Sequence, residues 1–165
     1  MTARTFARWV ETYAETLQED RQQMIDFARS APADFWGRPS PNEGWTNKDL
    51  LAHIVAPTDQ GVERLLRAVI SDGKIDRSVV VFDTDAANAE GVAARRERSV
   101  DELIVELQAS GEEMQDLLSQ LTDAHEHYRQ DDPPFVLSGF MELVMRARHD
   151  LEHLAQLRGS LEVEG

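Results

Sequence analysis

The chain has 165 residues, a size that suits one domain, and 41% of them are hydrophobic, enough for a packed core. Its 17 basic and 31 acidic residues give a net charge of −14, which argues against a nucleic-acid backbone or an anionic membrane as the partner. The chain has no cysteine, so disulfides, thiolate metal ligands and a cysteine nucleophile are excluded. The apolar runs are far shorter than the roughly 20 residues that span a bilayer, and no signal peptide follows Met1. We therefore expect a single cytoplasmic domain over residues 1–165.

The first part of the chain predicts a long helix followed by a loop. Apolar residues spaced by three and four predict a helix over about residues 3–29, which ends before Pro32. The prolines and glycines of residues 31–45 predict a long ordered loop. Three aromatic residues could be lid or rim residues of a site, but we expect them to anchor this loop on the core: Phe35, Trp36 and Trp45.

A capping box predicts where the second helix begins, because Thr46 and Asp49 have the residue types and the spacing of that motif. The apolar stripe that follows extends this helix to about Ile70. Pro57 lies inside it and cannot donate a hydrogen bond to the carbonyl of His53. We therefore expect a kink just after His53.

Residues 71–98 predict an irregular crossover, with a short extended piece at residues 79–82 and a short helix over residues 85–96. A second capping box, formed by Ser99 and Glu102, predicts a third helix that runs through Leu121.

A fourth helix is predicted from about Ser138 to Arg158, with Gly159 as its stop. Four long helices, with an elaborate crossover between the second and the third, predict an all-α fold of the four-helix-bundle type.

Two histidines of the predicted fourth helix give the strongest signal of chemistry. His149 and His153 are four residues apart, so their imidazoles stand on one helix face about 6 Å apart, within reach of one divalent ion. On a helical wheel these histidines, and His53 in the second helix, lie opposite the apolar stripes of their helices. Two interpretations remain open. The histidines could be solvated, or the two polar strips could line one cleft in which solvent reaches a metal site.

Other polar residues near the histidines allow more than one role. Asp150 and Glu152 point elsewhere on the wheel, so either could orient a ring N–H of a metal ligand or lie on the surface as a plain carboxylate. His125 and His127 are two residues apart, which would place their rings on opposite sides of a helix. We expect them to belong to a polar loop.

Two segments resemble the signatures of the DinB-like superfamily. Residues 44–54 (GWTNKDLLAHI) resemble its second-helix signature, and residues 149–157 (HDLEHLAQL) resemble its last-helix signature. The resemblance implies a four-helix bundle in which three histidines bind a divalent metal ion, usually zinc or nickel, and it carries that role to His53, His149 and His153. Some members, such as the mycothiol-dependent maleylpyruvate isomerase and the bacillithiol transferases, use the metal to activate a low-molecular-weight thiol. Others have no established activity.

The resemblance therefore implies a metal-dependent transferase that adds a small thiol to an electrophilic small molecule. Since the chain has no cysteine, the thiol would arrive as a cofactor. Three imidazoles leave a fourth position for water, thiol or substrate, which is typical of catalytic zinc. Two alternatives use the same triad: a non-catalytic metal-binding or stress-response module, and a metal-dependent hydrolase. Relatives of this fold are often homodimers, so we also expect a homodimer.

Overall fold

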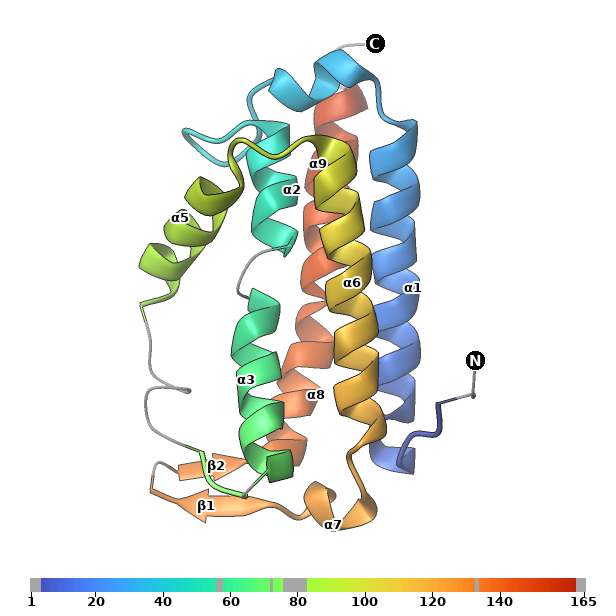
Figure 1. The fold of residues 1–165 in the computed structure, drawn as a ribbon, viewed down its shortest axis with the longest axis vertical. Helices are drawn as coiled ribbons and strands as arrows, with labels where there is room; N and C mark the ends of the chain where they lie inside the picture. The colour runs from blue at the N-terminus through green and yellow to red at the C-terminus, as the bar shows by residue number, and fades with distance from the viewer. Residues whose placement is uncertain (1–3, 56–57, 72, 76–82, 133, 163–165) are drawn as a thin grey trace.

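The computed structural model describes residues 4–55, 58–71, 73–75, 83–132 and 134–162, and α-helices dominate it (Figure 1). The helices are α1 (Arg8–Ser30), α2 (Asn47–Val55), α3 (Thr58–Ser71), α5 (Thr84–Arg95), α6 (Val100–Ser119), α7 (Asp123–Glu126), α8 (Leu137–Ala147) and α9 (His149–Glu162). A 3₁₀ turn covers Ala33–Gly37. Two short strands, β1 (Arg129–Asp131) and β2 (Pro134–Val136), pair antiparallel. The fold class is all-α, as the sequence predicted.

The long helices lie side by side along the long axis of the molecule (Figure 1). Helix α1 packs against α6, α8 and α9, while α2 packs against α6 and α9. Helix α3 continues the line of α2 and contacts α6, and α5 covers the outer side of α2. In the part of the chain that the structure describes, no helix combines the length and the apolar character needed to cross a bilayer.

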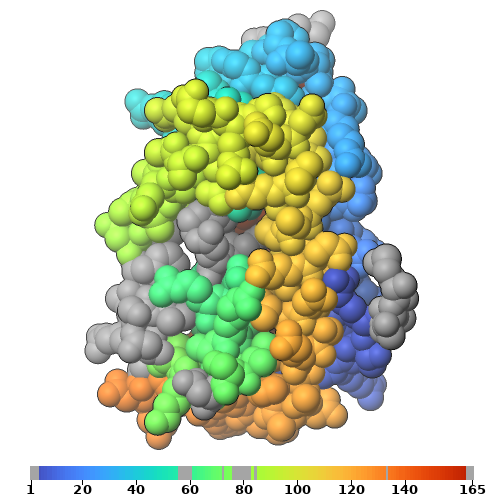
Figure 2. Space-filling view, viewed as in Figure 1, coloured from blue at the N-terminus to red at the C-terminus, as the bar shows by residue number. Residues whose placement is uncertain are grey.

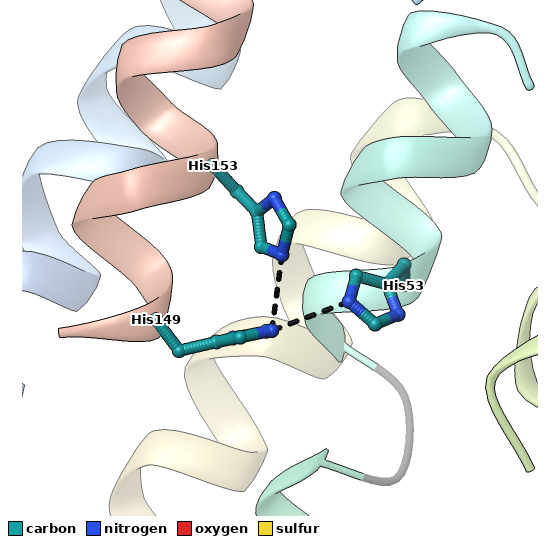
Figure 3. A group of neighbouring side chains, drawn as sticks. All are labelled: His53, His149 and His153. Atoms are coloured by element: carbon teal, nitrogen blue, oxygen red, sulfur yellow. Dashed lines mark hydrogen bonds between the residues drawn. The ribbon is translucent and has the colours of Figure 1, made fainter. Parts of the chain in front are cut away.

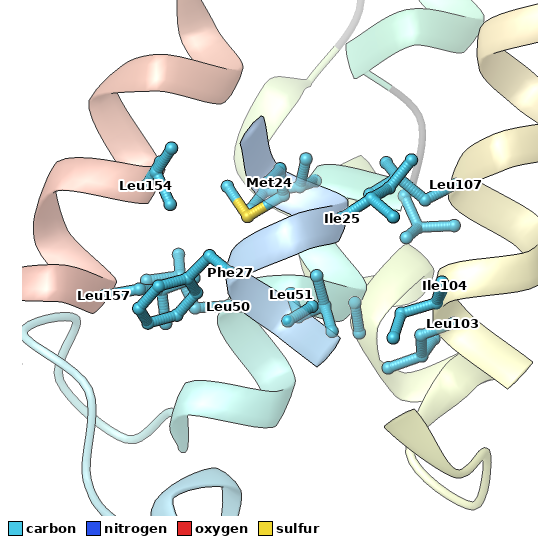
Figure 4. Packing of buried hydrophobic residues seen from close by; sticks show 14 of the residues in the cluster. Met24, Ile25, Phe27, Leu50, Leu51, Leu103, Ile104, Leu107, Leu154 and Leu157 are labelled. Atoms are coloured by element: carbon cyan, nitrogen blue, oxygen red, sulfur yellow. The ribbon is translucent and has the colours of Figure 1, made fainter. Parts of the chain in front are cut away.

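Two apolar clusters fill the interior, one toward each end of the helices. The first joins α1, α2, α6 and α9 (Figure 4), and its members include Met24, Phe27, Leu50, Leu51, Leu103, Leu107, Leu154 and Leu157. The second lies at the opposite end and includes Val10, Leu65, Leu66, Met114, Leu118, Leu137 and Met141. Charged and polar side chains lie between the clusters; we call the following set the polar layer: Asp20, Arg21, His53, Ser110, Arg148, His149, Asp150 and His153.

Both predicted capping boxes are confirmed. The Asp49 carboxylate accepts a hydrogen bond from the Thr46 N–H at 2.9 Å, and the Thr46 hydroxyl accepts one from the Asp49 N–H at 3.1 Å. Ser99 and Glu102 exchange the same two bonds, at 2.7 and 3.2 Å. These bonds satisfy N–H groups that have no partner within the helix, which explains why the helices begin there.

The first helix begins at Arg8, later than the predicted start near residue 3. The residues just before it are not helical, and Arg4 reaches across to α6, where it pairs with Glu112 and Asp116 at 2.7 Å each.

The predicted second helix consists of two described helices, because α2 ends at Val55 and α3 begins at Thr58. Pro57 and the kink predicted there lie outside the described residues, as does the extended piece predicted at residues 79–82. The short helix predicted over residues 85–96 is confirmed as α5, which Asp83 caps by accepting a hydrogen bond from the Ala86 N–H at 3.0 Å.

The predicted fourth helix is wrong in two respects. It is interrupted at Arg148, whose φ of 42° and ψ of 52° are left-handed, so α8 ends before this residue and α9 begins after it. Gly159 does not end α9, which continues to Glu162. Leu157 and Leu161, on either side of this glycine, pack in the first cluster and hold the helix together across it.

Candidate metal centre

Three histidine rings from two helices turn their Nε2 atoms toward one point (Figure 3). His53 lies in the last turn of α2, whereas His149 and His153 lie in the first two turns of α9. The Nε2 atom of His149 is 3.2 Å from that of His53 and 3.0 Å from that of His153. Within the described ranges, this is the one group of three or more His, Asp or Glu side chains whose ligand atoms converge closely enough to hold a metal ion.

The spacing and chemistry of the three nitrogens fit a divalent cation. In a tetrahedral zinc site with Zn–N bonds of about 2.0–2.1 Å, two ligand nitrogens lie roughly 3.3 Å apart. The observed 3.0 and 3.2 Å are close to that value. Hydrogen bonds alone cannot satisfy all three Nε2 atoms, because a protonated Nε2 of His149 can donate to only one of its two neighbours. A cation, in contrast, accepts a lone pair from all three.

Two of the three histidines are buried. His53 is 5% exposed and His153 is 9% exposed, while the side chain of His149 is 30% exposed. The interpretation of solvated histidines is therefore wrong for His53 and His153. The helical wheel failed because every residue of α2 except Lys48 is buried, so this helix has no solvent face for a polar strip to occupy.

Burial favours the neutral form of His53 and His153. Burial and the proximity of His149 and His153 lower the pKa of His53 to about 4. Burial also lowers the pKa of His153, and a hydrogen bond to Gln156 opposes this effect only in part. At pH 7 both rings therefore have a lone pair to offer, which is the protonation state that a metal requires.

Gln156 determines which nitrogen of His153 carries the proton. Its Oε1 atom lies 2.9 Å from Nδ1 of His153. Because a carbonyl oxygen only accepts, the proton is on Nδ1 and the lone pair is on Nε2, which faces the other two histidines. Such a bond to the outer ring nitrogen is typical of metal-binding histidines.

Of the three aromatic residues of the loop, Trp45 contacts the site. Phe35 and Trp36 are buried and pack edge-to-face against each other at 5.2 Å, which confirms that they anchor the loop. Trp45 packs on the first cluster, and its ring also lies 5.2 Å from that of His53. Nδ1 of His53 is buried and has no hydrogen-bond partner within the described residues.

Asp150 is a buried member of the site. Its Oδ2 atom accepts a hydrogen bond from Nε of Arg21 at 2.6 Å, and both side chains are about 95% buried. Its other oxygen, Oδ1, lies 3.7 Å from Nδ1 of His149. Burial alone would raise the pKa of Asp150, but the charge of Arg21 and the contact with His149 hold that pKa below its usual value. Asp150 is therefore a carboxylate beside His149, while Glu152 is exposed, as the surface alternative predicted.

Sequence reasoning did not find Asp20 or Arg21. They belong to the run Glu19-Asp20-Arg21-Gln22, whose composition is typical of a solvated helix face. His125, in contrast, lies in α7 rather than in a loop, and its Nδ1 accepts a hydrogen bond from the Thr122 N–H at 2.9 Å. Capping of α7 accounts for this histidine.

His149 is the partly exposed residue of the three histidines. A pocket between α1 and α8 reaches this histidine and is walled by Tyr13, Leu17, Val144, Met145 and Arg148. On the face seen in Figure 2, the surface is hollowed at mid-height between α5 and α3. A partly exposed ligand is what a site that exchanges its fourth ligand needs.

The family comparison covers all three histidines. The family model described as the mycothiol maleylpyruvate isomerase N-terminal domain matches residues 17–155, most of the chain. The chain belongs to this family. Its membership of the mycothiol maleylpyruvate isomerase N-terminal domain family confirms the resemblance seen at residues 44–54 and 149–157. No curated protein and no solved structure gives a significant match.

Proposed function

We propose that this chain is a divalent-metal-dependent enzyme that transfers a low-molecular-weight thiol to an electrophilic small molecule. The proposed metal ligands are the Nε2 atoms of His53, His149 and His153. The observation that supports this best is their convergence, at 3.0 and 3.2 Å from the central His149. The description of the family adds the chemical class, since it names both a thiol, mycothiol, and an isomerase.

Zinc or nickel is the proposed ion, because imidazole nitrogen suits both. Three protein ligands leave a fourth position open, which is the arrangement of catalytic rather than structural zinc. When bound, such an ion supplies a Lewis acid that lowers the pKa of a thiol or a water at the open position. The thiol has to come from outside the chain, which has no cysteine.

The residues around the triad have separate tasks in this proposal. Gln156 holds His153 in the tautomer that presents Nε2. Trp45 covers the ring of His53 and helps to exclude water on that side. His149, the most exposed of the three, marks the side from which a thiol and its electrophile enter.

The wider biochemical setting is also part of the proposal. The side-by-side long helices support a DinB-like four-helix bundle (Figure 1). We further propose that the protein is a cytoplasmic homodimer whose partner is a small-molecule substrate. Sedimentation at micromolar concentration tests the assembly, and a monomer there would contradict it.

Metal analysis of protein purified without a metal-affinity tag tests the ligands. We expect about one divalent ion per chain, lost in His53→Ala and His149→Ala but kept in His125→Ala, the matched control. Full metal retention in either triad variant would refute the ligand set.

Cobalt substitution tests what the ion does. Adding a small thiol should give a sulfur-to-cobalt charge-transfer band and speed the reaction with a model electrophile in the wild type, but not in His153→Ala. If added thiol left the spectrum unchanged but the spectrum titrated near neutral pH, as a metal-bound water does, a metal-dependent hydrolase would replace the transferase. If nothing perturbed the spectrum and metal removal unfolded the protein, a non-catalytic metal-binding module would replace it.

A further inference from the structure

Two consecutive residues of α1 bind the two residues that flank His149. Asp20 and Arg21 are only 3% and 4% exposed. Asp20 accepts a hydrogen bond from Nε of Arg148 at 3.0 Å and pairs with a second guanidinium nitrogen of the same residue. Arg21 donates to Asp150 at 2.6 Å. The backbone is therefore tied to α1 immediately before and immediately after His149.

His149 differs from the other two histidines in how its backbone is held. His153 lies within α9, where hydrogen bonds on both sides fix the backbone, and His53 lies two residues before the end of α2. His149 is the first residue of α9 and follows Arg148, whose left-handed conformation is unfavourable for any residue other than glycine. A break of this kind needs contacts from outside the helix to persist.

The side chain of Arg148 provides such a contact. Glycine would adopt the same φ without cost, but glycine has no group that could bind Asp20. The arginine bound to a buried carboxylate therefore fixes the break, and the Arg148 carbonyl accepts the first N–H groups of α9, from Leu151 and Glu152, at 2.9 and 3.0 Å.

We propose that Asp20 and Arg21 form a clamp that positions His149 as a metal ligand. Acting through Arg148 and Asp150, the clamp sets the direction in which α9 begins and so places Nε2 of His149 between the other two nitrogens. Asp20 and Arg21 are positioning residues and do not touch the ion. The metal-binding part of this inference rests on the proposed function, whereas the geometry of the clamp does not.

Ion pairs suit this task better than apolar contacts would. Apolar side chains of similar size often stabilise a buried position as well or better, but their contacts have no fixed direction. A guanidinium paired with a carboxylate sets both distance and orientation. The Nε2 atom of His149 lies close to the Nε2 atoms of both other histidines. A small shift of the His149 backbone therefore changes both of these distances.

Amide hydrogen exchange on metal-free protein tests the clamp. Asp20→Asn and Arg21→Met should each speed exchange of the Leu151 and Glu152 amides, while the rest of α9 changes less. Met114→Ala, which removes a buried side chain of the second cluster, controls for general destabilisation. The inference would be overturned if the exchange rates of these two amides rose no more in the clamp variants than in Met114→Ala.

Zinc affinity in a double-mutant cycle tests the link to His149. Asp20→Asn and Arg21→Met should each weaken Zn²⁺ binding about 10- to 100-fold in the wild-type background. Each triad variant keeps two histidines, whose weaker Zn²⁺ binding is measured by titration. In the His149→Ala background the loss caused by the clamp variants should shrink to less than about twofold, because His149 is then no longer there to be misplaced. It should persist in the His53→Ala background, which is the matched control.

The outcomes separate the two proposals. The clamp would be overturned, and the triad left unaffected, if Asp20→Asn and Arg21→Met weakened Zn²⁺ binding equally in the His149→Ala and His53→Ala backgrounds. The same holds if they weakened Zn²⁺ binding in no background. If the wild-type protein bound no Zn²⁺, the proposed function would fail, and amide exchange alone would decide whether the clamp holds the start of α9.

Discussion

Replacing Arg21 with methionine should destabilise the protein far more than replacing a surface arginine. Arg21 and Asp150 keep only 5% and 4% of their side-chain exposure, so Arg21→Met leaves a buried carboxylate without its cation. Breaking a buried ion pair from one side costs about 3–5 kcal/mol. We expect about 3 kcal/mol, the lower end, because the His149 ring lies 3.7 Å from Asp150 and remains a partner.

The assay is urea and thermal unfolding of metal-free protein, followed by circular dichroism. A loss of about 3 kcal/mol should lower Tm by roughly 6–12 °C in a domain of this size. Arg4→Met is the matched control, since Arg4 pairs with Glu112 and Asp116 at 2.7 Å each but on the surface. That control should lose no more than about 1 kcal/mol.

A second variant separates the buried charge from the lost packing. Arg21→Met combined with Asp150→Leu removes both charges, so it should be more stable than Arg21→Met alone. The reasoning would be refuted if Arg21→Met lost no more stability than Arg4→Met. It would also be refuted if the stability losses of Arg21→Met and Asp150→Leu simply added in the double variant.

Three further predictions concern the triad. Zn²⁺ at about 100 times its Kd should stabilise the wild type by about 2.7 kcal/mol and raise Tm by roughly 5–10 °C, whereas His153→Ala should show no such rise in thermal unfolding. Without metal, the urea midpoint should fall as the pH drops from 7 to 5. The reason is that His53 is protonated near its ordinary pKa of about 6.5 in the unfolded chain but only near a pKa of about 4 in the folded protein. A midpoint as pH-sensitive in His53→Ala as in the wild type would contradict this. Ni²⁺ should quench the fluorescence of Trp45, whose ring lies 5.2 Å from that of His53, and Trp45→Phe should lose most of the quenching; equal quenching in both proteins would place the ion elsewhere.

Local patterns were enough to predict most of the helices. The capping boxes at Thr46 and Ser99 depend only on residues three apart, and both are present in the structure. The pairing of His149 with His153 is local in the same sense, and their Nε2 atoms lie 3.0 Å apart. The resemblance at residues 44–54 added His53, whose position beside α9 no local pattern reveals.

Tertiary contacts decided what the sequence could not predict. The break at Arg148 has neither glycine nor proline to mark it, because Asp20, far away in α1, holds it. Burial of Asp150 follows from Arg21 in the same way. A helical wheel drawn for one helix contains no information about a partner on another helix. It therefore predicts that charged residues such as Arg21 and Asp150 are solvated.

The distance along the chain between His53 and His149 also bears on how the protein folds. The two residues are 96 positions apart, so the site exists only after the chain has closed a loop of that length and α2 has docked on α9. Contacts of such long range form slowly, since the entropy of loop closure opposes them. An ion held by all three rings would cross-link the chain much as a disulfide does, and a disulfide closing a loop of about 100 residues stabilises by roughly 4.7 kcal/mol in the chain-entropy model. In the unfolded chain only His149 and His153 remain near each other, so tight metal uptake should follow folding and should resist unfolding once it has occurred.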